Sequence, residues 1–323
     1  MFRTASGPRV FRQTSAAAGA VALIALGASP AAAEDPEPGL VLDRIAPFEG
    51  VEPGSTLSVP ATFTSTGSEA LSKVWVSYQV SRGLRISELP SNCRAWKVGG
   101  FDETPVSTKA VCSFEQRVEP GGVYAPEKDL PVKVLDNALY DGVTVVASSY
   151  DNTPGDEASG GPVQGTAPAV RLTGRTGATP SGEDVLEVPV KAVNTADLQV
   201  TGARLQGRVG DKVKLTVKFT NAGPAWVNDR KVGEPATRVF VRMPAGTTVT
   251  KGHGFCDRKS AGLYECGTSQ AWIDEGYPGT YTFELRIDKA VAGAEGSVAL
   301  EDAPRPYDPD KTNDKAGIAL AVT

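Results

Sequence analysis

Apolar and polar residues alternate with period two in the segment 210–224. Every second residue from Val213 to Phe219 is apolar, and lysines and threonines stand between them. This pattern is typical of a strand with one buried and one solvent-exposed face. Asn-Ala-Gly-Pro at 221–224 follows, where glycine supplies turn dihedrals and proline cannot continue a ladder. The segment therefore predicts a half-buried β-strand that ends in a turn.

The same pattern occurs 156 residues earlier in the chain. Three pairs of residues share this offset: Gly54 and Gly210, Phe63 and Phe219, and Gly67 and Gly223. Later features keep their order as well, since each half has a glycine ten residues before its first cysteine and a Pro-Gly turn after its second. The sequence therefore predicts an internal duplication.

Each half offers about seven short strands separated by turns, and helical periodicity is absent. This pattern predicts an all-β fold of two tandem immunoglobulin-like antiparallel β-sandwich domains, at 38–194 and 195–323. Residues 185–190 are expected to close the first domain, with 169–172 as an extra edge strand. Because no flexible linker occurs at 194–196, we expect a stiff tandem.

The first 33 residues predict export. Three arginines precede an apolar run at 16–26 and three alanines at 31–33, which is the order of a Sec signal peptide. The run is too short to span a bilayer as a mature helix, and no other apolar segment approaches spanning length. Removing 1–33 changes the net charge from −5 to −8, because the leader carries three arginines and no acidic residue. So acidic a chain is a poor generic binder of nucleic acid or anionic membrane.

Four cysteines occur, and an even count in an exported chain predicts disulfides. Pairing within each half, Cys93 with Cys112 and Cys256 with Cys266, is the simplest of the three connectivities. The spacing matches no zinc pattern. The residues between each pair are polar and loop-like, so we expect each bridge to staple a loop at one end of its sandwich.

The second half carries an ordered set of motifs. These are ADLQV at 196–200, the strand and turn at 210–224, MPAGT at 243–247, a cysteine-containing loop, a Pro-Gly turn and YDPDKTND at 307–314. This order resembles the immunoglobulin-like repeat of large bacterial and archaeal cell-surface proteins, over about 195–323. The first half matches more weakly, because Pro60 interrupts its strand. The resemblance implies a secreted, non-catalytic module at a Gram-positive, actinobacterial envelope.

These observations predict a secreted, cell-surface structural or adhesive protein that is not an enzyme and uses no cofactor. The alternative is a carbohydrate- or cell-wall-polymer-binding module. It would use loop tryptophans, chiefly Trp96 and Trp272, and the strand lysines Lys212 and Lys214. A hydrolase accessory or inhibitor is a third hypothesis. The partner would be a cell-wall polymer or another surface protein.

Two further groups of side chains bear on the chemistry. Candidate oxygen ligands for calcium are Asp308, Asp310, Asn313 and Asp314. The competing interpretation is a turn whose side chains cap backbone groups, since the glycine and terminal glutamate of an EF-hand loop are missing. His253, the single histidine, stands in a glycine-flanked loop, where we expect an exposed side chain and no catalytic base.

Overall fold

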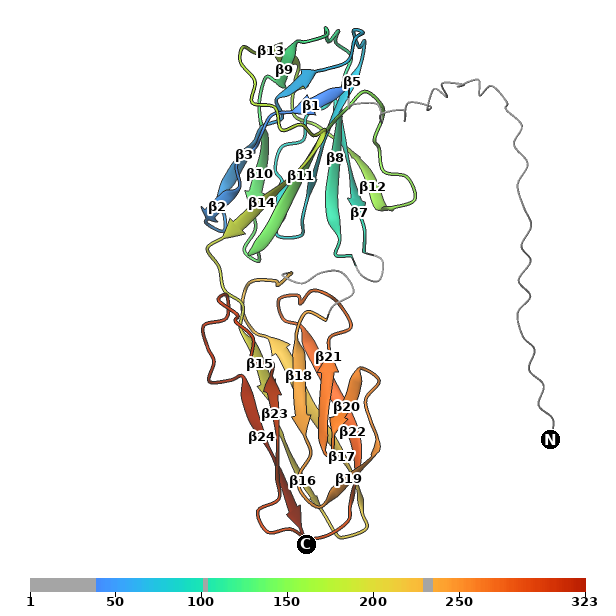
Figure 1. Ribbon diagram of the computed structural model, residues 1–323, viewed down its shortest axis with the longest axis vertical. Helices are drawn as coiled ribbons and strands as arrows, with labels where there is room; N and C mark the ends of the chain where they lie inside the picture. The colour runs from blue at the N-terminus through green and yellow to red at the C-terminus, as the bar shows by residue number, and fades with distance from the viewer. Residues whose placement is uncertain (1–38, 101–103, 229–234) are drawn as a thin grey trace, which may run out of the picture. The chain divides into compact units, whose positions relative to one another are not determined.

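The computed structural model describes residues 39–100, 104–228 and 235–323 (Figure 1). The predicted signal peptide, residues 1–33, lies outside the described residues. Every regular element in the described ranges is a β-strand, so the prediction of an all-β fold is confirmed. No helix in these ranges is long and apolar enough to cross a membrane.

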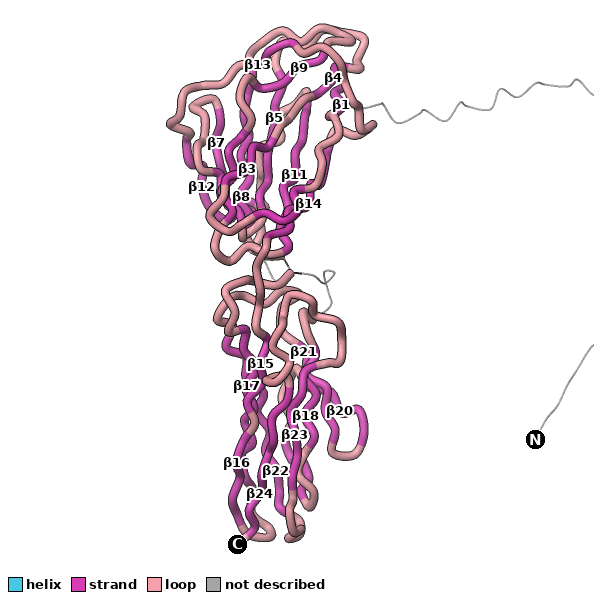
Figure 2. Tube along the Cα trace, turned by 90° about the vertical axis from the view of Figure 1, so that its left-hand side faces the viewer, coloured by secondary structure: helices cyan, strands magenta, loops and turns pink. Residues whose placement is uncertain are grey.

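The strands of residues 40–192 form one large sheet and two smaller ones (Figure 2). The large sheet has the order β12 (Ala158–Gln164), β7 (Cys93–Val98), β8 (Ser107–Phe114), β5 (Val74–Val80), β11 (Tyr140–Ser148), β14 (Val185–Ala192) and β2 (Phe48–Val51). One small sheet consists of β1 (Leu40–Leu42), β4 (Phe63–Ser65), β9 (Val123–Pro126) and β13 (Leu172–Gly174). The other consists of β3 (Thr56–Val59), β10 (Leu130–Val134) and β6 (Leu84–Ile86).

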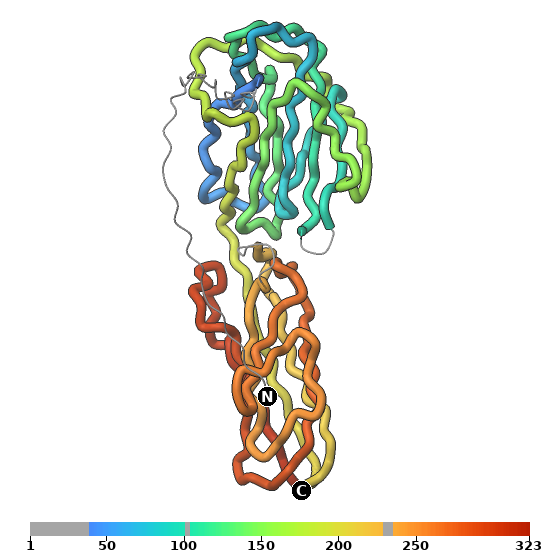
Figure 3. The backbone as a smooth tube through the Cα atoms, turned by 45° about the vertical axis from the view of Figure 1, so that its right-hand side comes forward, coloured from blue at the N-terminus to red at the C-terminus, as the bar shows by residue number. Residues whose placement is uncertain are grey.

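The strands of residues 198–322 form two sheets. The first has the order β15 (Leu198–Thr201), β17 (Lys212–Asn221), β22 (Pro278–Ile287) and β19 (Thr247–Lys251). The second has the order β16 (Ala203–Gly207), β24 (Lys315–Val322), β23 (Glu295–Leu300), β18 (Arg238–Arg242), β21 (Leu263–Gly267) and β20 (Cys256–Ser260). Throughout the described residues, the strands of one set pair only with strands of the same set. Along the tube of Figure 3 the two sets occupy separate colour ranges.

The two sets repeat one topology. In the larger sheets, the order β7-β8-β5-β11-β14-β2 of the first set corresponds to β20-β21-β18-β23-β24-β16 of the second. In both, only the last pair of strands is parallel. The strand β12 is an addition in the first set. We call the sandwich of 40–192 the first sandwich and that of 198–322 the second; the bounds 38–194 and 195–323 stay a prediction.

The opening strand behaves as its pattern predicts. Leu215, Val217 and Phe219 of β17 are fully buried. Asn221 at its end is buried as well, and its side chain holds the turn: Oδ1 accepts from the Gly223 amide at 3.2 Å and Nδ2 donates to the Ala225 carbonyl at 2.8 Å. A buried amide with several partners fixes a turn, since an unpaired one would be costly.

The earlier copy of this strand is split. Pro60 has no N–H to donate to a ladder, and β3 ends at Val59 while β4 begins at Phe63. Phe63 is still fully buried, as is Phe219 at the matching position. The glycines that precede the strands, Gly54 and Gly210, both have positive φ, +87° and +95°, a conformation that glycine adopts without steric cost. The interruption therefore breaks the hydrogen-bonding pattern without changing which face is buried.

Each sandwich has its own core, formed between the inner faces of its sheets. In the first, Val59 and Val132 of the small sheets share one cluster with Val76 and Val145 of the large sheet. In the second, residues of both sheets form a corresponding cluster, and Leu139 from the start of β11 joins it. The expectation of about seven strands per half is too low, since β1 to β14 belong to the first half and β15 to β24 to the second.

Candidate functional site

Both cysteine pairs lie at disulfide distance, with Sγ–Sγ separations of 2.00 Å for Cys93–Cys112 and 2.05 Å for Cys256–Cys266. The prediction that the bridges staple end loops is wrong. Cys93 on β7 is the direct partner of Cys112 on β8, and Cys256 on β20 is the direct partner of Cys266 on β21. Each bridge therefore joins neighbouring antiparallel strands. Between Cys256 and Cys266, residues 257–260 are exposed and belong to β20, whereas Ser107, Thr108 and Lys109 of β8, between Cys93 and Cys112, are half-buried.

The tryptophans do not form an exposed platform. Trp96 and Trp272 are 6% and 7% exposed, and Trp226 is fully buried. Trp96 lies within β7 and not in a loop, where it clusters with Val98, Val111 and the partly buried Trp75. Sugar stacking needs an open ring face, so the burial of Trp96 and Trp272 contradicts the idea that they bind a glycan.

Two lysines of β17 lie beside a glutamate on the neighbouring strand β22. Lys212 Nζ lies 3.0 Å from Glu284 Oε1, while Lys214 and Glu284 are direct ladder partners. Hydrogen bonds from Thr250 and then Lys212 hold the pKa of Glu284 below its ordinary value. Lys214, Glu284, Lys251 and His253 line a pocket of about 480 Å³. His253 is half-buried rather than exposed, with its ring edge-on to Tyr281 at 5.4 Å.

The acidic segment near the C-terminus encloses a cation of the chain itself. Arg305, 6% exposed, pairs with Asp314 and, at 3.4 Å, with Asp308, whose side chain is fully buried. Burial raises the pKa of Asp308, and Lys311 opposes that rise. Asp310 caps the turn, accepting from the Thr312 amide at 2.9 Å. Hydrogen bonds from Thr312 hold the pKa of Asp310 below its ordinary value.

The guanidinium of Arg305 thus takes the place that calcium would need. Asn313, the fourth candidate, donates from Nδ2 to Asp197 Oδ1 at 2.7 Å. Within the described ranges, no group of three or more His, Cys, Asp or Glu residues has the geometry to hold a metal ion. The bonds of Asp310 to Thr312 are those that the capping interpretation predicts. Sequence inspection missed Arg305.

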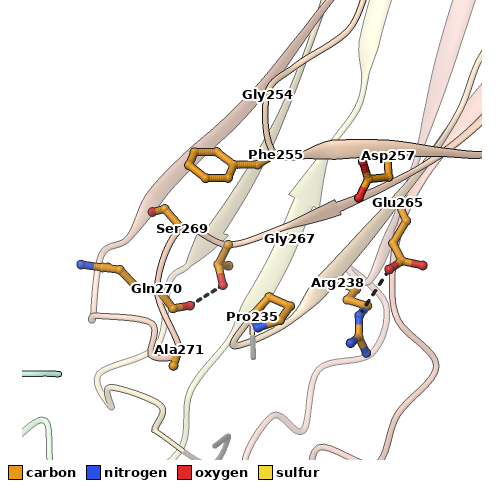
Figure 4. A pocket seen from close by; sticks show the side chains of 11 residues that line it. Pro235, Arg238, Gly254, Phe255, Asp257, Glu265, Gly267, Ser269, Gln270 and Ala271 are labelled. Carbon is orange, nitrogen blue, oxygen red and sulfur yellow. Dashed lines mark hydrogen bonds and ion pairs between the residues drawn. The ribbon is translucent and has the colours of Figure 1, made fainter. Parts of the chain in front are cut away.

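An open, polar pocket of about 420 Å³ lies beside β20 (Figure 4). Phe255, just before β20, is 56% exposed at its rim, an unusual position for a phenylalanine. Arg238 on β18, which β21 separates from β20, lies 3.4 Å from Glu265 Oε1, and Lys259 lies 3.1 Å from the other oxygen of that carboxylate. Ser269 and Gln270 form the opposite wall. The pocket combines an exposed ring with charged and amide side chains.

A second cluster centres on the buried carboxylate of Asp141, at the start of β11. Its Oδ1 accepts from Ser81 Oγ at 2.5 Å and from the Gly83 amide at 2.9 Å. Its Oδ2 accepts from the Leu139 amide at 3.0 Å and from the indole of Trp226 at 3.2 Å. Four donors compensate the burial of one carboxylate, as a buried charge requires. Neither Asp141 nor Trp226 stands out in the sequence.

Comparison with solved structures gives remote similarities. A cohesin of Acetivibrio cellulolyticus, solved in complex with a dockerin, aligns at 13% identity over 39% of this chain and 99% of its own, with a TM-score of 0.25. A non-cellulosomal cohesin of Archaeoglobus fulgidus aligns at 13% over 39% of this chain and 86% of its own, with a TM-score of 0.22. The titin domains z1z2, in complex with telethonin, align at 11% over 88% of this chain and 96% of their own, with a TM-score of 0.22. No protein-family model and no curated protein matches the chain.

The fold is therefore assigned from the strand order of the chain and not from these similarities. It is an all-β protein of immunoglobulin-like β-sandwich type. Similarities this remote carry no argument about function.

Proposed function

We propose that the protein is a secreted, non-catalytic structural or adhesive module of a cell surface, built as a stiff tandem of two immunoglobulin-like repeats. The contacts that join residues of the two sandwiches carry this proposal. The Trp226 indole reaches Asp141, and Arg82 pairs with Asp274 and Glu275, each at 3.0 Å. Burial raises the pKa of Asp274, and Arg82 opposes the rise.

Backbone and side-chain bonds add to these contacts. The Trp226 amide donates to the Asn137 carbonyl at 3.1 Å, and Asn137 Nδ2 donates to Glu275 at 3.2 Å. Asn194 Nδ2, between the two strand sets, donates to the Asp136 and Ala138 carbonyls, both at 2.8 Å. Relative motion of two domains is expected where their interface is small and polar. Bonds of this kind restrict that motion. A stiff tandem suits a protein that presents a surface at a distance from its anchor.

The stiffness is tested by ¹⁵N relaxation on the full chain. We expect the two sandwiches to report one common rotational correlation time. Trp226→Phe combined with Arg82→Ala removes the indole donor and the guanidinium, and separates the two correlation times. Lys73→Ala, which removes only the exposed pair with Glu115, serves as the matched control and leaves them equal. Two different correlation times in the unmodified chain would contradict the proposal.

Surface location needs a separate test. When intact cells that express the chain with its leader are treated with protease, we expect peptides of both sandwiches to be released. Peptides that appear only after cell lysis would contradict a surface role. The presence of two cysteine pairs at disulfide distance supports an oxidising compartment.

The alternative function, binding of an anionic cell-wall polymer, keeps one specific observation in its favour. Lys214 and Lys251 line the pocket around Glu284, with Lys212 beside it. The tryptophan part of that hypothesis has lost its support. If the lysines bind polymer, then saturable binding to purified teichoic acid falls steeply with salt and disappears in Lys214→Ala with Lys251→Ala. If the double variant still binds teichoic acid, the pocket is not the binding site.

A further inference from the structure

The first sandwich covers the outer edge of β7 with a later segment of its own chain. The strand β12 pairs with β7 in antiparallel fashion, and the Gly165 amide donates to the Cys93 carbonyl at 3.0 Å. Gln164 Nε2 donates to the carbonyls of Ser91 and Cys93, at 2.7 and 3.1 Å. The covering segment thus continues the sheet by one strand beyond the disulfide.

Two side chains hold the rest of this segment by its backbone. The Gln116 amide grips Leu172 from both sides: Oε1 accepts from the Leu172 amide at 2.7 Å, and Nε2 donates to the Leu172 carbonyl at 3.1 Å. Asn92 Oδ1 accepts from the Val170 amide at 3.1 Å. Backbone-directed bonds of this kind recognise an extended chain and not a particular side chain.

The second sandwich has the corresponding edge strand and one of these two side chains, the glutamine, without the cover. The strand β20 corresponds to β7 and ends its sheet, and no described strand pairs with its outer edge. Gln270 stands four residues after the second cysteine of its pair, as Gln116 does. No bond of the Gln270 side chain to a described residue is seen, and it lines the pocket of Figure 4. Phe255 immediately precedes Cys256, as Asn92 precedes Cys93.

The loops before the two strands also agree in their internal bonds. The Cys256 amide donates to the His253 carbonyl at 3.1 Å, and the Cys93 amide donates to the Pro90 carbonyl at 2.9 Å. The Gly267 amide donates to the Phe255 carbonyl at 3.0 Å, just as the Ser113 amide donates to the Asn92 carbonyl at 3.0 Å. The two edges therefore share these backbone bonds next to the first cysteine, although β20 has a bulge that β7 lacks, and only the edge of β7 is covered.

We propose that the edge formed by β20, Phe255 and Gln270 is a docking site for an extended peptide segment of a partner protein. The segment adds to the sheet as a strand antiparallel to β20, as β12 adds to β7. Gln270 grips its backbone as Gln116 grips Leu172. This site gives the protein a partner-binding function that does not depend on the stiffness of the tandem.

The chemistry of the edge defines the partner segment. The covering residues 158–170 contain no charged side chain and are rich in glycine, alanine and proline. The side chains of Asp257, Arg258 and Lys259 carry both signs of charge and are exposed, and an uncharged segment avoids an unfavourable pairing with any of them. The exposed ring of Phe255 adds apolar surface for a small apolar side chain. The partner segment is therefore extended, uncharged and rich in small residues.

The probe for this site is a synthetic peptide with the sequence of residues 158–172, in which Arg171 is replaced by alanine so that no side chain is charged. Titrated into the ¹⁵N-labelled full chain, it should cause saturable shifts at the amides of β20 and of Phe255. Gln270→Ala should weaken binding about tenfold, the value expected for two lost backbone hydrogen bonds. Ser269→Ala, which changes the neighbouring pocket residue without touching the amide grip, should bind as the unmodified chain does.

Three outcomes would overturn the proposal. One is the absence of saturable shifts at β20 at about 1 mM peptide, the weak end of useful affinity. Another is equal affinity in Gln270→Ala and Ser269→Ala. The third is an edge-to-edge dimer of the full chain through β20 in sedimentation equilibrium, because the edge would then serve a second copy.

Discussion

The outer faces of the two large sheets share a strand order but differ in chemistry. At two matching ladder positions, the first sandwich has apolar side chains and the second has charged ones: Trp75 against Arg238, and Val111 against Glu265. Trp96 and Lys259 each stand three residues after the first cysteine of their pair, although Lys259 lies at a bulge of β20. The apolar three form a small cluster with Ala158 of β12. The charged three form ion pairs at the surface.

This difference explains why only one edge is covered. Exposed tryptophans next to an open strand edge would promote association, and β12 removes both hazards at once. Charged side chains keep the edge of β20 soluble without a cover, because lysine and mixed charge discourage edge pairing. The duplication therefore kept the backbone and diverged in the layer that decides whether the edge is open to a partner.

The largest effect is expected from substitutions in these two outer faces. Trp96→Ala should lower the free energy of unfolding of the first sandwich by about 3–5 kcal/mol, because it empties the cluster under β12. Lys259→Ala should change that of the second sandwich by less than about 1 kcal/mol, since it removes one exposed ion pair. Denaturant unfolding followed by NMR signals from each sandwich separates the two. Equal losses of stability in the two variants would mean that the outer faces do not differ in how much their side chains stabilise the sandwiches.

The disulfides should give an intermediate effect. Replacing Cys93 and Cys112 by serine should lower the stability of the first sandwich by about 2–4 kcal/mol, and replacing Cys256 and Cys266 should do the same in the second. The closed loops span 19 and 10 residues, so chain entropy makes the first loss larger by roughly 0.6 kcal/mol. Thermal unfolding of the two double variants provides the measurement. A loss that is clearly larger in the second sandwich would indicate that its bridge stabilises the open edge of β20 in the folded state.

The smallest effect on stability is expected from two similar turns, one in the first sandwich and one in the second. Asp151 accepts from Thr153 Oγ1, and Asp310 accepts from Thr312 Oγ1, both at 2.6 Å. In each case the threonine side-chain bond is the main cause that lowers the carboxyl pKa. A carboxyl group whose pKa is lower in the folded than in the unfolded state stabilises the fold at a pH above its unfolded-state pKa. This stabilisation is lost as the pH falls below about 4, through the pKa of the folded state.

Thr153→Val and Thr312→Val should therefore raise the pKa of Asp151 and Asp310 toward the ordinary carboxyl value. Carboxyl ¹³C titration by NMR measures both. If neither pKa moves, the threonine bonds do not determine the titration of these turns.

The sequence predicted those parts of the fold that obey a simple period. Alternation located β17, and the offset of 156 residues located the duplication. It failed where a strand is exposed on both faces. Residues 257–260 of β20 are all exposed, so no alternation marks them, and their sequence predicts a loop between the cysteines. Because β20 shows no alternation, the sequence also does not reveal that the bridge at its end joins neighbouring strands.

The candidate sites were less predictable, because they depend on contacts between distant residues. Arg305 and Asp141 look ordinary in the sequence, and their burial follows only from the packing around them. Trp226 and Trp272 lie outside the strands, as the sequence predicts, whereas Trp96 lies in β7, and local sequence does not reveal that β12 covers it. One sequence feature did point to the proposed site: Gln116 and Gln270 stand at the same distance from the second cysteine of their halves.

Hydrogen–deuterium exchange of the free chain tests the central difference between the two edges most directly. The amides of β7 lie between two strands and those of β20 beside only one described strand. We predict that the fastest amides of β20 exchange at least about tenfold faster than those of β7, and that the peptide 158–172 slows those of β20 alone. Equal protection of β7 and β20 in the free chain would contradict the account, because it would mean that the edge of β20 is already covered.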